Sequence, residues 1–265
     1  MQLADRHVLI TGGSQGIGLE TARLAVARGA RVTLVARTEV VLAEAAAAIG
    51  HGAIGIAADV TDPAAVETAV AEAETTHGPV DLLVTSAGVS HPGYYEQIPL
   101  AVIRAQMDVM YFGTVHAVRA VLPGMLERGS GGLVGVSSTA GLIGVFGYGA
   151  YAPAKYAVRG LFETLHAEYG HRGIHAACVF PPDTLTPGFA AENLIKPPET
   201  VAVSAGVKPR TAETVAAAIV RGIEKGKRII TADPGTAALA KGGAPVAAVA
   251  ERQMATALRK HNRRQ

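Results

Sequence analysis

Three residues in the middle of the chain have side chains and a spacing suited to proton transfer. Tyr151 and Lys155 are four residues apart in YAPAK, and Ser138 ends the apolar run LVGVSS. On a helix, residues i and i+4 share a face about 5–6 Å apart, so the lysine charge can lower a phenol pKa that starts near about 10. The serine could hydrogen-bond the oxygen that the tyrosine protonates. This pattern indicates acid–base chemistry on a carbonyl/alcohol pair, but it also fits a packed tyrosine beside a solvated lysine.

The composition narrows the class of protein. The 265 residues are 49% hydrophobic but only 5% aromatic, with no tryptophan and a formal net charge of +2. Such a chain is long enough for one large α/β domain with a parallel sheet covered on both faces. The small charge and the lack of a nucleic-acid-binding motif argue against a nucleic-acid partner. The histidines are scattered, so we expect no metal site. Cys178 is the only cysteine, in the apolar run HAACVF, which indicates a buried strand residue.

The chain shows no sign of a membrane or export segment. It begins MQLADRHVLITGG, without a signal-peptide pattern, and has no uninterrupted apolar run of about 18 residues. We therefore expect a cytoplasmic protein. The C-terminal basic residues, Arg252, Arg259, Lys260, Arg263 and Arg264, indicate a solvated helix end. Weak peripheral contact with an anionic membrane is the alternative.

Short β-rich runs alternate with longer helical patterns along most of the chain. Strands are expected near 7–11, 31–36, 53–58, 80–85, 132–137, 174–180 and 227–231, and helices near 16–28, 39–49, 63–76, 99–127, 150–170 and 212–225. This alternation predicts a Rossmann-type, doubly wound parallel sheet of about seven strands with helices on both faces. We expect a single domain over 1–265, with a ligand crevice at the carboxyl ends of the strands.

Two segments depart from this alternation. Residues 181–210 are rich in proline and too long for an ordinary connection, which indicates a lid or substrate-binding loop. Residues 235–265 follow the last expected strand and are interpreted as a C-terminal extension.

The first expected strand runs directly into the glycine-rich sequence TGGSQGIG, which spans Thr11 to Gly18. Glycines allow a tight turn and a close approach of the backbone to a pyrophosphate, and the helix that follows presents its amino terminus to the phosphate charge. Because a strand precedes the turn and a helix follows it, we interpret it as a dinucleotide site rather than a simple connection.

The end of the second strand bears on which dinucleotide binds. NAD-binding proteins usually place an acidic residue there to hold the ribose 2′-hydroxyl, but this chain has Ala36 followed by Arg37. A guanidinium can pair with a 2′-phosphate, and Ser14 could add a hydrogen bond. We therefore expect NADP(H), although Arg37 could also be a surface residue without a ligand.

These motifs, in this order, resemble the short-chain dehydrogenase/reductase family over almost the whole chain. Asp59-Val60 matches the family's adenine-contacting pair. Ser86-Ala87-Gly88 is similar to its NAG turn, with Thr85 and Ser86 in place of the usual asparagines. Pro181 to Thr186 matches the segment that contacts the nicotinamide, with Pro182 where glycine is usual.

The resemblance implies a role for each matching residue. Tyr151 would be the general acid in reduction and the base in oxidation, Lys155 would lower its pKa and hold the nicotinamide ribose, and Ser138 would polarise the carbonyl. The residues expected to bind the cofactor are Gly12, Ser14, Gln15, Gly16, Ile17, Gly18, Arg37, Asp59, Val60, Ala87, Gly88, Tyr151, Lys155, Pro181, Thr184 and Thr186. The resemblance also implies a homodimer or homotetramer packed through the fourth and fifth helices.

One position departs from the family pattern. The family usually has an asparagine in the fourth helix that holds a water in the proton relay to the lysine, and Met110 stands there. Methionine offers no comparable hydrogen-bonding group. We expect either a relay rebuilt from backbone and water or a slower proton step.

Longer segments narrow the resemblance to 3-ketodihydrosphingosine (3-dehydrosphinganine) reductases, which use NADPH to reduce the ketone of a long-chain amino-ketone in sphingolipid synthesis. These segments are PPDTLTPGFAAENLIKPPET, TLVARTEVVL and AGLIGVFGYGAYAPAKYAVRGL. An apolar trough is expected from Ile143, Val145, Phe146, Phe189 and Leu194, with Glu192 or Asp183 near a substrate ammonium; the alternative is packing between lid and core. Two other readings stay open: a reductase of another ketone (steroid, β-ketoacyl or xenobiotic) and a dinucleotide-sensing protein without catalysis.

Overall fold

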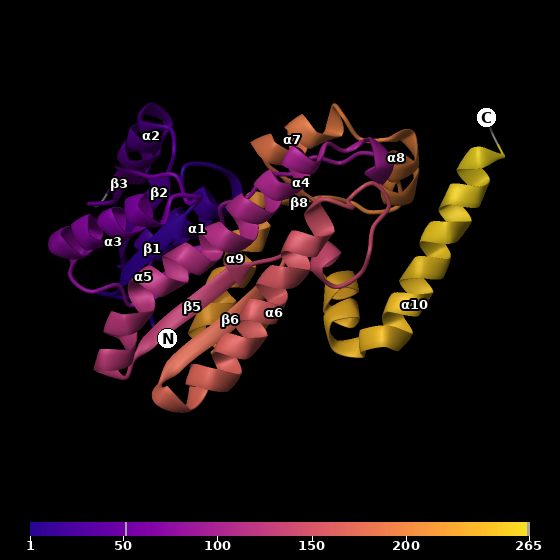
Figure 1. Ribbon diagram of the computed structural model, residues 1–265. Coiled ribbons are helices and arrows are strands. Elements are labelled where there is room, and N and C mark those ends of the chain that lie inside the picture. The colour runs from indigo at the N-terminus through magenta and orange to yellow at the C-terminus, as the bar shows by residue number, and fades with distance from the viewer. Residues whose placement is uncertain (51, 264–265) are drawn as a thin grey trace.

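A seven-stranded parallel sheet forms the centre of the protein (Figure 1). The computed structural model describes residues 1–50 and 52–263. The strand order is β3-β2-β1-β4-β5-β6-β9. The strands are β1 (His7–Thr11), β2 (Arg31–Ala36), β3 (Ile54–Ala57), β4 (Leu82–Thr85), β5 (Gly131–Val136), β6 (Ile174–Phe180) and β9 (Ile229–Thr231). The predicted doubly wound fold is confirmed, and the expected strands differ only at their ends.

Helices cover both faces of the sheet because the strands are apolar on both sides. They are α1 (Gly16–Val26), α2 (Glu39–Ile49), α3 (Pro63–His77), α4 (Leu100–Met107), α5 (Gly113–Arg128), α6 (Tyr151–Tyr169) and α9 (Ala212–Glu224). Short 3₁₀ turns occur at Tyr95–Gln97, Thr139–Gly141 and Gly170–Arg172. One core cluster joins the sheet to α1, α2 and α9, and the other joins it to α3, α5 and α6.

A close approach between α6 and β5 positions the helix that carries Tyr151 and Lys155. The Phe162 ring lies where a Cβ at Gly135 would be. Both residues are buried, and Phe162 belongs to the core cluster on this face of the sheet. Glycine in β5 therefore lets α6 lie close to the strand whose end carries Ser138.

The prediction of one continuous helix over 99–127 is wrong in one respect. Asp108–Phe112 forms a π-helical turn between α4 and α5, with the buried Met110 inside it. The stretch Leu100–Arg128 is long and apolar enough to meet the length and composition criteria for a membrane span. However, Ala117, Val118, Val121 and Met125 belong to the core cluster beside α3 and α6. We therefore interpret the stretch Leu100–Arg128 as helices that pack on the sheet rather than as a membrane span.

The segment 181–210, predicted as a lid, contains short regular elements. Strands β7 (Thr184–Leu185) and β8 (Arg210–Thr211) pair in parallel near its two ends, and helices α7 (Pro187–Asn193) and α8 (Pro198–Ser204) lie between them. The pairing holds the base of the lid beside the carboxyl end of β6.

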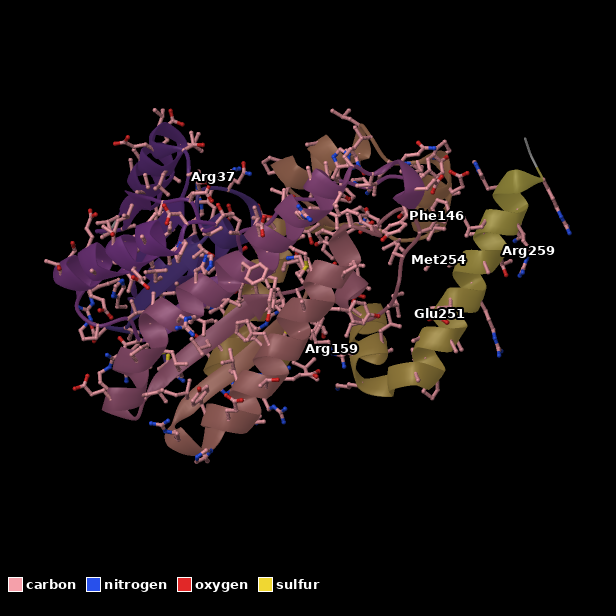
Figure 2. All side chains as sticks on the ribbon, viewed as in Figure 1. Arg37, Phe146, Arg159, Glu251, Met254 and Arg259 are labelled. Atoms are coloured by element: carbon pink, nitrogen blue, oxygen red, sulfur yellow. The ribbon has the colours of Figure 1, made fainter. Side chains whose placement is uncertain are left out.

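The C-terminal extension is mostly helical. Helix α10 (Pro234–Asn262) has two halves that meet at Gly243, and its second half extends beyond the body of the fold (Figure 1). Met254 lies on the side of this half that faces the body, whereas Arg259 lies on the outer side (Figure 2). The expected solvated, basic end is seen at Arg259 and Lys260, which are exposed; Arg264 and residue 265 lie outside the described residues.

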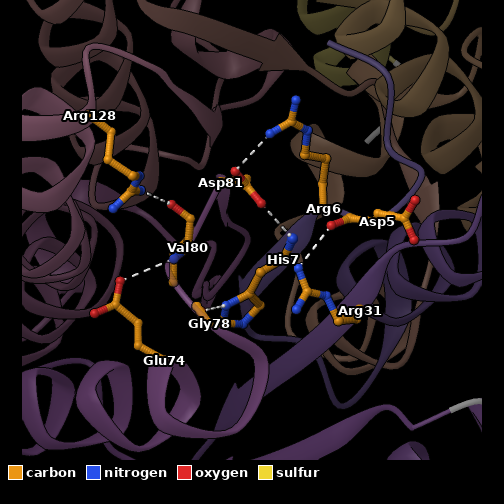
Figure 3. Close-up of polar contacts among 9 residues, drawn as sticks. All are labelled: Asp5, Arg6, His7, Arg31, Glu74, Gly78, Val80, Asp81 and Arg128. Atoms are coloured by element: carbon orange, nitrogen blue, oxygen red, sulfur yellow. Dashed lines mark hydrogen bonds and ion pairs between the residues drawn. The ribbon is translucent and has the colours of Figure 1, made fainter.

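A polar network at the amino ends of the strands connects the start of β1 to the segment between α3 and β4 (Figure 3). Asp81 accepts a hydrogen bond from the His7 backbone at 2.9 Å and pairs with Arg6 at 3.2 Å. The His7 ring bonds the Gly78 carbonyl at 2.6 Å and the Thr33 hydroxyl at 2.9 Å. These contacts hold β1, β2 and β4 in register, so that their carboxyl ends reach the same edge.

The buried His7 makes stability depend on pH. Burial is the main cause that lowers its pKa below the usual 6.5, and the nearby His77 lowers it further. A lowered pKa means that the unfolded chain takes up a proton more readily, so this contribution is complete above about pH 6.5 and is lost as pH falls below it.

We predict that the melting temperature falls on acidification from about pH 7.5 to about pH 5.5, and that His7→Gln reduces this fall. At the higher pH the variant should be less stable by about 1–3 kcal/mol, because Gly78 and Thr33 lose buried partners. In His7→Gln the decrease in melting temperature should become smaller but not disappear, since burial also lowers the pKa of His77 and His175. The exposed His171→Gln is the control. An equal pH dependence in wild type and His7→Gln would contradict the assignment.

Candidate active site

A single cavity of about 1060 Å³ lies at the carboxyl ends of the strands, between the sheet, the lid and α10. Its lining includes the predicted catalytic residues Ser138, Tyr151 and Lys155. It also includes the predicted cofactor residues Gly12, Ser14, Gln15, Gly16, Ile17, Arg37, Asp59, Val60, Ala87, Gly88, Pro181, Thr184 and Thr186. Of the predicted catalytic and cofactor-binding residues, only Gly18 is outside this lining, and its place in the turn explains why.

The glycine turn has the geometry that a bound pyrophosphate requires. Gly12 has φ +67, and a Cβ there would lie 2.6 Å from the Ala87 nitrogen at the end of β4. Gly18 faces the turn itself, since a Cβ there would meet the Gly12 carbonyl oxygen. The side chain of Gln15, which precedes α1, does not cap the helix, so its first N–H groups have no side-chain partner. This helix end and the close backbone fit a phosphate group.

Arg37 and Asp59 follow β2 and β3 at one end of the cavity. Arg37 is exposed. The Asp59 carboxylate accepts hydrogen bonds from the backbone and hydroxyl of Thr61 at 2.9 and 2.8 Å. The backbone bond is the main cause that lowers the Asp59 pKa, and the charge of Arg37 lowers it too. This end of the cavity therefore offers both a cation and a fixed carboxylate.

Lys155 is buried and anchored to the end of β5. Its side chain is 5% exposed, and its ammonium donates a hydrogen bond to the Val136 carbonyl at 2.9 Å. The Ser137 hydroxyl donates a hydrogen bond to the Lys155 carbonyl at 2.8 Å. Helix α6 and the end of β5 therefore each donate a hydrogen bond to the other. Burial lowers the pKa of Lys155 to about 8. The lysine thus places a weakly held proton inside the protein.

Tyr151 lies beside Ser138, but its pKa differs from the prediction. Burial is the main cause and raises the pKa of Tyr151; a hydrogen bond with Ser138 lowers it, and the charges of Glu192 and Asp183 raise it. The Lys155 ammonium lies 5.6 Å from the centre of the tyrosine ring and donates to Val136 instead. The expectation that Lys155 lowers the Tyr151 pKa is therefore wrong for this arrangement, in which desolvation dominates.

Ser138 takes its position from the turn after β5. Its backbone is extended, and its hydroxyl accepts a hydrogen bond from the Ala140 backbone at 3.1 Å, which caps the 3₁₀ turn Thr139–Gly141. The next residue, Thr139, donates its backbone N–H to the Pro181 carbonyl at 2.9 Å. The serine is therefore held between β5 and the start of the lid.

The lid brings a group of charged and aromatic side chains to Tyr151. Glu192 accepts hydrogen bonds from the Tyr148 hydroxyl at 2.7 Å and from the Lys196 ammonium at 2.8 Å. The same ammonium lies 4.2 Å from the centre of the Phe189 ring. The side chain of Lys196 is only 3% exposed, so Glu192 is largely neutralised by an internal cation.

Asp183 is the less compensated carboxylate of this group. Burial raises its pKa, while the charge of Lys196 opposes that rise. The backbone carbonyl of Asp183 accepts a hydrogen bond from the Arg210 N–H at 2.8 Å. Because Asp183 lines the cavity and its charge acts on Tyr151, it is a candidate partner for a cationic group beside a reacting carbonyl.

The predicted apolar trough is partly wrong. Ile143, Val145 and Phe189 line the cavity, but Phe146 and Leu194 do not. Leu194 lies just after α7 and is 86% exposed. The Phe146 ring packs edge-on against Tyr94 at 6.2 Å, outside the cavity lining.

Met110 and Lys155 both lie beside Gly88, as the sequence position of Met110 suggested. A Cβ added at Gly88 would be 3.7 Å from the Lys155 ammonium and 3.9 Å from the Met110 sulfur. The Met110 carbonyl accepts a hydrogen bond from the Thr114 hydroxyl at 2.7 Å. The thioether therefore occupies the place where a polar relay side chain would reach Lys155.

Other residues of the site were missed from the sequence. They are Ser137, Tyr148, Lys196 and the part of α10 that lines the cavity. Tyr148 stands in GYGAY, three residues before Tyr151, and Lys196 is four residues after Glu192, so the spacing of both pairs could have suggested them. Within residues 1–50 and 52–263, no cluster of His, Cys, Asp or Glu is suited to hold a metal ion.

The comparisons with known proteins agree with this geometry. The family model described as short chain dehydrogenase matches residues 6–196. The chain is similar to the 3-dehydrosphinganine reductase of Danio rerio, at 39% identity over 95% of this chain and 79% of that protein. It is similar to the 3-ketodihydrosphingosine reductase of Bos taurus, at 40% identity over 85% of this chain and 70% of that protein.

A solved structure has the same fold. The crystal structure of levodione reductase superposes with a TM-score of 0.80 at 27% identity, over 89% of this chain and 99% of that one. The fold, the glycine turn and the Ser–Tyr–Lys group all agree with the family match. The chain is a short-chain dehydrogenase, an oxidoreductase with a nicotinamide dinucleotide site.

Proposed function

We propose that this enzyme uses NADPH to reduce a long-chain amino-ketone, 3-ketodihydrosphingosine, to the secondary alcohol. The observation that carries this proposal is the position of Asp183 and Glu192, whose charges act on Tyr151 inside a largely apolar cavity. In this substrate the ammonium is on the carbon next to the ketone. A carboxylate beside the proton donor suits that substrate and offers nothing to a plain hydrocarbon ketone. The sphingoid reductases among its relatives support the same substrate.

Each residue of the site has a distinct task in this proposal. Ser138 donates a hydrogen bond to the carbonyl oxygen, Tyr151 gives that oxygen its proton, and Lys155 resupplies the proton from the interior. The nicotinamide, when bound, supplies the hydride. Asp183 holds the substrate ammonium and so orients the ketone toward Ser138 and Tyr151.

Cofactor choice rests on Arg37 and Ser14. Arg37 follows β2 where a ribose 2′-substituent would lie, and Ser14 lines the same cavity. A guanidinium favours a phosphate there through charge-assisted hydrogen bonds. Asp59 partly offsets the charge of Arg37, yet it is bonded to Thr61 and leaves the guanidinium available.

Reduction of a neutral ketone is the second candidate, and one observation favours it. Glu192 is already paired with Lys196, which leaves Asp183 as the weaker anionic partner for a substrate ammonium. Burial also raises the pKa of Asp183, which disfavours its charged form, so the cavity suits an uncharged carbonyl compound as well.

Assembly and location are proposed on lesser grounds. Phe112, in the π-helical turn between α4 and α5, is 45% exposed, and Tyr156 of α6 is 41% exposed. Apolar groups on this face support a homodimer or homotetramer packed there. We also propose a cytoplasmic location with at most peripheral membrane contact.

Following NADPH absorbance tests the proposed reaction. We predict oxidation of NADPH with 3-ketodihydrosphingosine and a lower kcat/KM with a matched ketone that lacks the amino group. Arg37→Ala should lower kcat/KM for NADPH by about 10- to 100-fold and leave NADH within about twofold, because one charged hydrogen-bonding partner of the 2′-phosphate is lost. Arg23→Ala, which removes an exposed arginine from α1, is the control. Turnover of other ketones but not the sphingoid ketone would favour the second candidate.

Met110 should limit proton supply to Lys155. We predict that Met110→Asn raises the single-turnover rate of reduction by about two- to tenfold and shifts its pH profile, because an amide beside the ammonium can hold a water. Met110→Leu keeps the site apolar and is the matched control. Identical rates and pH profiles for both variants and wild type would show that the thioether does not limit the proton step.

A further inference from the structure

Helix α10 changes direction in front of the cavity. Asp233 caps its start by accepting a hydrogen bond from the Thr236 N–H at 3.0 Å. The two halves meet at Gly243, where φ is 57 and ψ is −146, a backbone conformation that essentially only glycine adopts. Pro245 follows, with no N–H to continue the preceding helix. Glycine and proline therefore set the second half of the helix in a new direction.

One face of this second half lines the catalytic cavity. The lining residues are Val246, Val249, Ala250, Gln253, Met254 and Ala257, and we call them the α10 stripe. Their spacing of three and four residues places them on a single helix face. The stripe spans twelve residues, or about 17 Å of helix axis. Five of its six side chains are apolar.

The α10 stripe is not packed as a protein core. Val249 is 52% exposed, and none of the described side chains from 244 to 261 is fully buried. Helix α10 as a whole contacts α8 and β9. Across the cavity, Ala202, Val203 and Val207 of α8 and the residues after it contribute further small apolar surface. Apolar side chains therefore face each other across a space that the protein does not fill.

We propose that the α10 stripe is the wall of a subsite for the alkyl chain of the substrate. The space beside it is continuous with the cavity that holds Tyr151, so a ketone placed at Tyr151 can extend its chain along the helix. A hydrocarbon chain needs no hydrogen-bond partner, and the stripe offers almost none. This inference rests on the proposed function, since it assigns the long-chain part of the same substrate.

The orientation of the stripe argues against a flat membrane as its partner. Met254 faces the body of the protein, whereas the basic Arg259 lies on the outer face (Figure 2). A bilayer would meet the outer face, where Arg259 lies. A single hydrocarbon chain can enter the space between α10 and α8.

The subsite predicts a dependence on chain length that is specific to α10. Each methylene fully buried is worth roughly 0.8 kcal/mol, which converts to about a fourfold gain in kcat/KM. In a series of 2-amino-3-ketones of increasing length, wild-type kcat/KM should rise about two- to fourfold per methylene until the stripe is covered. Met254→Glu should reduce the ratio of long-chain to short-chain kcat/KM by at least about tenfold. Thr256→Glu, on the same half of α10 but outside the lining, should keep the wild-type ratio.

A binding measurement separates this inference from the proposed reaction. Calorimetry with the corresponding amino-alcohols, in the presence of NADP⁺, should show the same dependence on length and the same loss in Met254→Glu. If the protein binds these amino-alcohols in that way but reduces no ketone, the proposed reaction is wrong and the subsite stands. Equal dependence on length in wild type and Met254→Glu would overturn the subsite. So would a Met254→Glu variant that loses only binding to vesicles of anionic lipid.

Discussion

The active site depends on a pair of hydrogen bonds between the end of β5 and the first turns of α6. The buried Lys155 ammonium donates to the Val136 carbonyl, and the Ser137 hydroxyl donates to the Lys155 carbonyl. A lysine removed from water needs such a partner, because a buried unpaired charge is costly. The two bonds fix α6 against the strand, and Gly135 leaves room for Phe162 to complete the contact. Ser138, Tyr151 and Lys155 share a cavity because strand and helix cannot slide past one another.

Around this fixed centre, the cavity is divided between rigid and adaptable walls. The glycine turn and the ends of the strands form the wall suited to a dinucleotide, with Gly12 pressed against Ala87. The opposite walls are the lid and the second half of α10, whose side chains are less buried and make few contacts with the core. The end of the sheet therefore supplies the groups for cofactor binding and proton transfer. The lid and α10 supply the groups that select the substrate. Glu192 and Asp183 connect the two parts, because they come from the lid and their charges act on Tyr151. Lys196, also from the lid, pairs with Glu192.

Much of the fold could be predicted because the strands and helices of the core carry strong local patterns. The glycine turn, Arg37 and the Ser138–Tyr151–Lys155 series were recognisable from residue type and order, and the structure brings them to one edge of the sheet. The failures depend on contacts between distant segments. Leu194 looked like a trough residue, yet it lies outward just after α7. The Tyr151 pKa rises because burial outweighs the hydrogen bond with Ser138. The π-helical turn at Met110 and the place of α10 beside the cavity are likewise tertiary properties.

Single-turnover reduction by Tyr151→Phe, followed by NADPH absorbance, tests most directly whether Tyr151 is the proton donor. The variant keeps the ring and removes only the hydroxyl, and NADPH fluorescence reports separately whether the cofactor still binds. We predict wild-type affinity for NADPH and a rate of ketone reduction lowered by about a hundred- to ten-thousandfold, the usual effect of losing a general acid. Ketone reduction at the wild-type rate in Tyr151→Phe, with NADPH bound normally, would contradict it.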